Sequence, residues 1–204
     1  MLENFIFTSM QKYFLTYFIF GILLLSFTAC SSQPETIKDL SSESYNLVNS
    51  DSISVTFPDD YRGKTTLITF IYTHCPDVCP IITANMKNIQ SDLADTSNIR
   101  FVEITFDPER DRPSVLANYK DLYRLDEQFS LLTGQPAEID SLLSSLNIVA
   151  QKIKADSSTS DSSRYTMMHS NTIYLMDKQG RIRKEYPANI VPPENVIEDL
   201  QAIR

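Results

Sequence analysis

The chain has 204 residues, of which 42% are hydrophobic and 22% are charged, a balance typical of a folded globular domain rather than a disordered chain. The formal net charge is −8 and no cluster of basic residues is present, which argues against nucleic acid as a partner. With two histidines, three cysteines and no tryptophan, the chain offers few places for chemistry that requires thiolate or imidazole groups.

The first 29 residues read as a targeting segment. Residues 13–29 form an apolar run of signal-sequence length, and the run ends at Ala29-Cys30, followed by a polar tract. Small residues before a cysteine at this boundary resemble the lipobox of bacterial lipoproteins, in which Cys30 would become the lipidated residue. The alternative is an uncleaved signal anchor, because the run approaches the span of about 20 residues that a membrane helix needs. Both interpretations place the rest of the chain on the extracytoplasmic face of a bacterial membrane.

The Ser-rich stretch 30–44 is predicted to be a flexible tether, and residues 45–204 are predicted to form one folded domain. The pattern predicts strands at 45–48, 53–57, 65–72, 99–106, 129–132, 148–153, 172–176 and 181–186. Helices are predicted at 81–93, 114–123, 136–146 and from Pro192/Pro193 to Ile203. The strand at 65–72 lacks polar alternation, as expected of a central strand, whereas 154–163 is too polar to bury much surface. The order predicts an α/β domain with a mixed central sheet flanked by helices, as in the thioredoxin fold.

Cys75 and Cys79 stand four positions apart, where the buried strand turns into a helix. In helical geometry this spacing places both side chains on one face, with Cα atoms about 6 Å apart. Because a helix N-terminus favours anions, both thiols are expected to ionise more readily than a free cysteine. Two thiolates on one face can hold a soft cation or close into a disulfide, and the sequence permits both.

The spacing favours a metal clamp over a fast disulfide exchanger, because thioredoxin-type redox enzymes use a gap one residue shorter and prolines stiffen this loop. Soft monovalent copper binds well to sulfur plus imidazole, so a histidine is the expected third ligand. His74 directly precedes Cys75, and its side chain is expected to point away from the thiols. His169 precedes the strand at 172–176, and in thioredoxin-like folds that loop faces the cysteine-bearing helix. His169 is therefore the predicted ligand.

Four segments resemble the signature segments of the Sco/SenC family: THCPDVCP at 73–80, DPERDRP at 107–113, LTG at 132–134 and HSNTIYL at 169–175. The resemblance covers about residues 45–203. It implies a thioredoxin-like fold with an added N-terminal β-hairpin and a β-hairpin insertion, and copper bound through Cys75, Cys79 and His169. It also implies a metallochaperone that helps to build the dinuclear copper centre of cytochrome c oxidase, so the partner would be the copper-bearing subunit or another copper protein.

The same residues also allow other functions. A thiol–disulfide reductase that keeps a partner's cysteines reduced would need Cys75 and Cys79 but not His169, and it is the main alternative to a non-enzymatic carrier. A peroxidase of the peroxiredoxin type is disfavoured because no threonine stands three residues before a lone cysteine. A structural zinc site is disfavoured because two cysteines and one histidine leave the usual shell of four ligands incomplete.

Two further pairs of residues are expected to have structural roles. Met167 and Met168 are interpreted as packing residues, with a thioether ligand at Met168 as the sharper alternative. Asp107 and Asp111 could form a paired-carboxylate acid–base site, but carboxylates also suit the end of a strand and the start of a helix. They are interpreted as support for the metal site, with Asp107 the closer neighbour.

Overall fold

The computed structural model describes residues 35–154 and 165–203 of the chain. The predicted targeting segment and Cys30 lie outside these residues. No helix in the described part combines the length and the apolar character that crossing a membrane requires.

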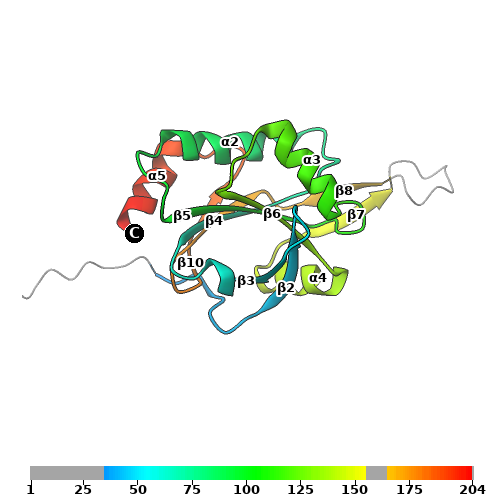
Figure 1. Cartoon of the computed structure of the whole chain (residues 1–204), viewed down its shortest axis with the longest axis horizontal. Helices are drawn as coiled ribbons and strands as arrows, with labels where there is room; N and C mark the ends of the chain where they lie inside the picture. Colours follow the sequence, from blue (N-terminus) through cyan, green and yellow to red (C-terminus); the bar gives the residue numbers. More distant parts are fainter. Residues whose placement is uncertain (1–34, 155–164, 204) are drawn as a thin grey trace, which may run out of the picture. The chain divides into compact units, whose positions relative to one another are not determined.

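Eight strands form one mixed sheet (Figure 1). Across the sheet their order is β1 (Lys38–Asp39), β10 (Arg181–Pro187), β9 (Thr172–Met176), β4 (Thr65–Ile71), β5 (Ile99–Thr105), β6 (Phe129–Gly134), β2 (Tyr45–Asn49) and β3 (Ser54–Phe57). The three central strands β4, β5 and β6 run parallel, and β9 is antiparallel to β4. Every residue of β4 is buried, which confirms its expected central place and explains why its sequence does not alternate.

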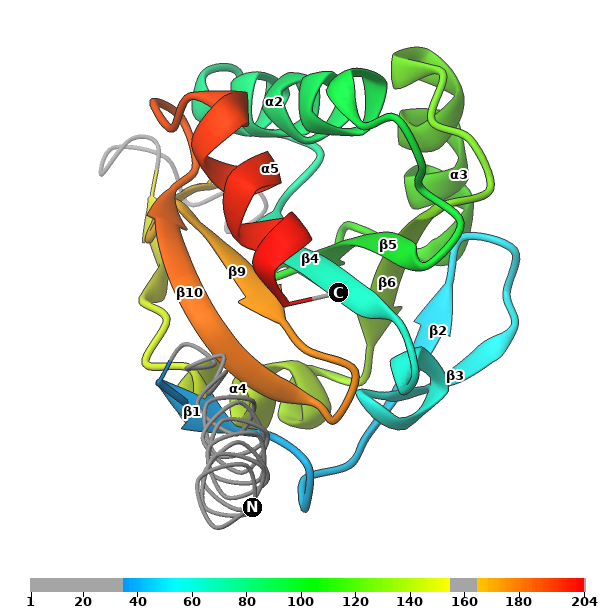
Figure 2. The same ribbon diagram turned by 90° about the vertical axis from the view of Figure 1, so that its left-hand side faces the viewer.

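Helices cover both faces of this sheet (Figure 1). They are α2 (Val78–Asp92), α3 (Pro113–Tyr123), α4 (Pro136–Ser145) and α5 (Pro193–Ala202). The last three begin with proline, whose fixed φ and missing N–H suit a first helical position. Figure 2 shows α2 and α5 on the same side of the sheet. Asn85 of α2 donates to the backbone carbonyl of Ala188, in the segment between β10 and α5, at 2.8 Å. Because α2 begins at residue 78 rather than 81, Cys79 lies inside the helix and Cys75 before it.

Two parts of the structure differ from the sequence-based expectation. The strand β1 and the fully buried Leu40 lie within the segment predicted as a tether, so the folded domain extends further toward the N-terminus than residue 45. Strand β8 (Tyr165–His169) is absent from the predicted strands. It pairs with β7 (Ala150–Lys154) in a separate two-stranded sheet. Of the polar stretch predicted at 154–163, Lys154 belongs to β7 and the rest lies outside the described residues.

Helix α2 is fastened to the sheet by a buried polar contact. Thr83 donates to Glu103 of β5 at 3.1 Å, and the hydroxyl of Tyr119 in α3 lies 2.8 Å from Thr83. Glu103 is fully buried, and its Oε1 atom has no hydrogen-bond partner. Burial raises the pKa of Glu103 to about 8, so this carboxyl is mostly protonated at neutral pH.

We expect Glu103 to make the protein less stable as pH rises. Between the ordinary glutamate pKa of 4.5 and about 8, the unfolded chain releases a proton that the folded chain retains. The free energy of unfolding should therefore fall by about 1.4 kcal/mol per pH unit in this window. Glu103→Gln, which keeps the side-chain shape, should remove most of this slope in urea unfolding at pH 5 and pH 7.5. The exposed Glu127→Gln is the control, and equal slopes in wild type and Glu103→Gln would contradict the prediction.

Candidate metal centre

The pairing of β4 with β9 determines where the site lies. Thr69 near the end of β4 faces Ile173 near the start of antiparallel β9. The loop that follows β4 and the residues that precede β9 therefore meet at the same edge of the sheet. This edge brings together Cys75, Cys79 and His169, whose donor atoms all lie within 4.8 Å of one another.

The three donor atoms are spaced for one ion. The Sγ atom of Cys79 lies 4.0 Å from Nε2 of His169, and the backbone N–H of Cys79 donates to Sγ of Cys75 at 3.5 Å. Both cysteines are free thiols. An ion bound by sulfur and nitrogen with bonds of about 2.0–2.3 Å brings its ligand atoms to distances close to these. The residues present therefore fit a metal ion of borderline or soft character, and they are also close enough to form a disulfide after a small movement.

The imidazole of His169 is oriented for ligation. Its Nδ1 atom lies 3.1 Å from the carbonyl oxygen of Ser170, which can only accept, so Nδ1 carries the proton and the lone pair is on Nε2. The ring packs against Phe106, with centroids 4.6 Å apart, and edge-on against Tyr72 at 5.8 Å. Two aromatic side chains and one backbone carbonyl thus hold the ring with Nε2 toward Cys79.

The pKa values of the two thiols are shifted in opposite directions. Burial raises the pKa of Cys75, but hydrogen bonds from the backbone of Cys79, Asp77 and Val78 outweigh burial and leave this pKa below its ordinary value. Burial raises the pKa of Cys79 far above its ordinary value, and the neighbouring Cys75 raises it further. The expectation that the helix start acidifies both thiols is correct for Cys75 and wrong for Cys79. Cys79 is fully buried inside α2, where the cost of burying a charge exceeds the effect of the helix N-terminus.

His74 and Met168 lie apart from the donor group. The Nδ1 atom of His74 faces the hydroxyl of Thr73 at 3.1 Å and a carboxylate oxygen of Asp111 at 4.0 Å, as expected of a side chain that points away from the thiols. In β8, Met167 is buried, which agrees with a packing role, whereas Met168 is 49% exposed, so the same interpretation is wrong there. Alternation along the strand places Met168 on the opposite face from His169, which disfavours a thioether ligand.

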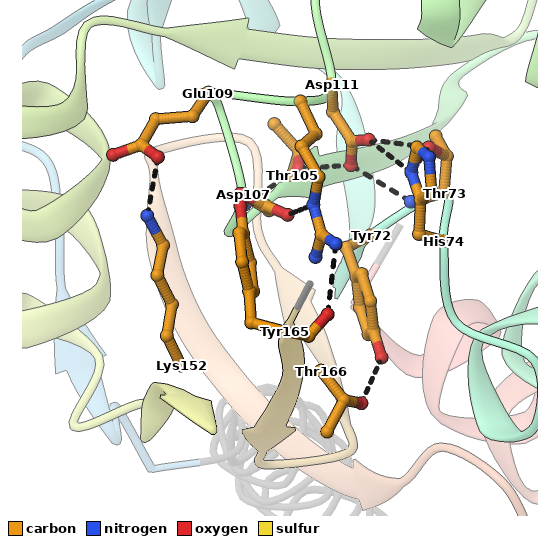
Figure 3. A network of polar contacts seen from close by, with 11 residues as sticks. Tyr72, Thr73, His74, Thr105, Asp107, Glu109, Asp111, Lys152, Tyr165 and Thr166 are labelled. Atoms are coloured by element: carbon orange, nitrogen blue, oxygen red, sulfur yellow. Dashed lines mark hydrogen bonds and ion pairs between the residues drawn. The ribbon is translucent and has the colours of Figure 1, made fainter. Parts of the chain in front are cut away.

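The loop 107–111 contacts both Thr73, just before Cys75, and Tyr165, in the strand that carries His169 (Figure 3). Asp111 accepts from the backbone N–H of Thr73 at 2.9 Å and from the Thr105 hydroxyl at 2.7 Å. Asp107 forms an ion pair with Arg110 and accepts from the Tyr165 hydroxyl at 2.6 Å. These contacts explain both carboxylates as structural groups rather than a paired acid–base site. Burial raises the pKa of Asp111, although its hydrogen bonds act in the other direction.

Three residues beside the site, Tyr72, Arg110 and Tyr165, were not singled out from the sequence. Arg110 stands inside the motif 107–113, and its position three residues after Asp107 was the available signal. The sequence pattern places Tyr72 in a strand and gives no further signal. Tyr165 carries no local signal, because its place depends on a strand pairing that the sequence does not reveal.

The fold and the site define a class: a thioredoxin-like protein with a dithiol–imidazole centre at the sheet edge. Within this class, residues 33–204 match the model of the SCO1/SenC family, and the chain belongs to that family. It is 27% identical over 190 residues to the SCO1 protein homolog of Bacillus subtilis, a match that covers 89% of this chain and 93% of that protein. It is 34% identical over 137 residues to a SCO2-like protein of Rickettsia prowazekii, with 67% of this chain and 64% of that protein covered.

Solved structures agree with the predicted fold and family. The structure of Bradyrhizobium japonicum ScoI with copper bound has a TM-score of 0.63 and 33% identity, with 79% of this chain and 98% of that chain covered. The structure of BsSco, a member of the Sco family of cytochrome c oxidase assembly proteins with a disulfide switch, has a TM-score of 0.69 and 25% identity, with 84% and 98% covered. The predicted thioredoxin-like fold with a mixed sheet and the predicted family are both confirmed.

We expect iodoacetamide to modify Cys75 before Cys79 in the reduced, metal-free protein. The lower pKa of Cys75 gives it a larger thiolate fraction at pH 7, whereas Cys79 is protonated and fully buried. Because one pKa unit changes the thiolate fraction tenfold, the rates should differ by at least about tenfold. Peptide mass spectrometry over a time course measures both rates. Cys79→Ser tests the Cys75 rate by itself, and faster labelling of Cys79 would contradict the assignment.

Proposed function

We propose that this chain is a copper metallochaperone that binds one copper ion through Cys75, Cys79 and His169. The observation that carries this proposal is the convergence of two thiol sulfurs and one imidazole nitrogen within 4.8 Å. Thiolate and imidazole ligands suit copper in both of its common oxidation states. The family match and the copper-bound structure of the related ScoI support the choice of metal.

A three-ligand set at the sheet edge suits a cargo ion better than a structural one. A structural zinc site takes four protein ligands in a closed shell, and this group offers three. His169 is half-buried and Cys75 retains a small exposed fraction, so incoming ligands of a partner can reach the ion. An ion held in this way is bound selectively and can still be transferred.

We propose further that the recipient is the dinuclear copper centre of cytochrome c oxidase, or another copper protein outside the cytoplasm. Membership of the SCO1/SenC family supports this target, since a relative in that family is described as a cytochrome c oxidase assembly protein. The apolar run that ends at Ala29-Cys30 supports anchoring by a lipid on Cys30, with the domain on the extracytoplasmic side.

A thiol–disulfide reductase remains the second candidate because of the asymmetry of the two thiols. An acidic thiol with some exposure beside a buried, protonated one is suited to attack and resolution. In such a reaction the Cys75 thiolate attacks a partner disulfide and releases one partner thiolate. Cys79, after losing its proton, then displaces the second partner thiolate, and the chain is left with a Cys75–Cys79 disulfide.

Anaerobic copper(I) titration of the reduced protein tests the proposal. Wild type should bind one equivalent, and His169→Ala should lose at least about tenfold in affinity, since even ligand-supporting residues contribute that much at metal sites. His74→Ala is the matched control, because this histidine is next to Cys75 but faces Thr73 and Asp111. It should bind as wild type does.

The same variants separate the two candidate functions. If His169→Ala binds copper as tightly as wild type, the proposed copper site is wrong. If it loses copper but fully supports maturation of the partner's copper centre, the reductase function accounts for the activity instead. Loss of both copper binding and maturation supports the metallochaperone.

A further inference from the structure

The hairpin that carries His169 buries few of its own side chains. Strands β7 and β8 form a two-stranded sheet apart from the main sheet, and within these described strands only Met167 is buried. A two-stranded hairpin is marginally stable at best without further packing. The position of His169 therefore depends on what attaches the hairpin to the body of the domain.

Arg110 makes the most extensive of these attachments. Its guanidinium carbon lies 3.6 Å from the ring centroid of Tyr165, the first residue of β8. Its Nη1 atom donates to the backbone carbonyl of the same residue at 3.1 Å, and its Nε atom is paired with Asp107. A planar guanidinium stacked on an aromatic face, with its N–H groups directed in fixed directions, determines both distance and orientation.

The carboxylate of Asp107 completes this attachment from the other side. One of its oxygens is paired with Arg110 and the other accepts from the Tyr165 hydroxyl. Burial raises the pKa of Tyr165, and the bond to Asp107 raises it further, so this hydroxyl keeps its proton and donates. The three side chains form a closed ring of contacts, which we call the Arg110 clamp.

The Arg110 clamp is continuous with the packing of His169. The guanidinium of Arg110 also lies 5.6 Å from the ring centroid of Tyr72. The Tyr72 hydroxyl bonds the side chain of Thr166 in β8 at 3.0 Å (Figure 3). The Tyr72 ring also packs edge-on against His169. The strand is thus held at its first two residues and at its last.

We propose that Arg110 is a positioning residue that holds β8 so that the His169 imidazole faces the two thiols. This inference rests on the proposed copper site. It gives the loop 107–111 two separate roles, in which Asp111 fixes the segment before Cys75, and Arg110 with Asp107 fixes the strand before His169. The metal site is complete only when both attachments are made.

Arg110→Lys tests this role because lysine keeps the positive charge and loses the planar, stacked fork. We expect its affinity for copper(I), measured by anaerobic competition with a chromophoric chelator, to fall by about tenfold or more. Arg62→Lys is the matched control. Arg62 also pairs through Nε with an aspartate three residues earlier and donates to backbone carbonyls, but it lies beyond the opposite end of β4. This variant should bind copper as wild type does.

A double variant separates positioning from general destabilisation. In a His169→Ala background, Arg110→Lys should cause no further loss of copper affinity, because the ligand it positions is gone. In the metal-free protein, hydrogen exchange of the β8 amides should be at least about tenfold faster in Arg110→Lys than in wild type, with Arg62→Lys unchanged. Tyr165→Phe, which removes only the hydroxyl bonded to Asp107, should give a smaller loss of affinity than Arg110→Lys.

The inference is overturned if Arg110→Lys and Tyr165→Phe both retain wild-type affinity, or if Arg110→Lys weakens binding equally with and without His169. Either result leaves the copper site itself standing. Failure of the proposed function has a different signature, namely wild-type affinity in His169→Ala.

Discussion

The antiparallel pairing of β4 with β9 is the constraint on which the site depends. Two of its donor residues, Cys79 and His169, are 90 positions apart in the sequence, and no local structure can bring them together. The register that sets Thr69 opposite Ile173 does so, because it places the end of one strand beside the beginning of the other. Every residue of β4 is buried, so a shift of the strand by one position would exchange the side chains packed on the two faces of the sheet.

The protein interior next to the site favours the protonated, uncharged form of acidic side chains. Cys79 and Glu103 are both fully buried, and burial raises the pKa of each, so both hold protons in the metal-free protein at neutral pH. A cation that binds the two sulfurs takes the place of the Cys79 proton, and the charge buried there changes little. Metal binding at such a site is therefore linked to proton release. Cys75, at the open side, supplies the ready anion.

Much of this arrangement could be predicted from local sequence patterns. The rest depends on contacts between segments that are distant in the sequence. The buried run of β4, the prolines that start α3, α4 and α5, and the spacing of Cys75 and Cys79 are properties of short segments. Strand β8 was missed because Tyr165–His169 has no strong apolar pattern, and its pairing with β7 skips an intervening polar stretch. The acidity of Cys79 was misjudged because it depends on what packs over α2, which spacing cannot reveal.

The separation of β7 and β8 from the main sheet has a practical consequence. Ala150 pairs with His169 at one end of the hairpin, and Lys154 pairs with Tyr165 at the other, about 13 Å away at the usual rise per residue. The connection between residues 154 and 165 therefore joins the hairpin at the end remote from the donors. A fluorescent or affinity label on the exposed side chain of Lys154 would therefore lie at that remote end of the hairpin.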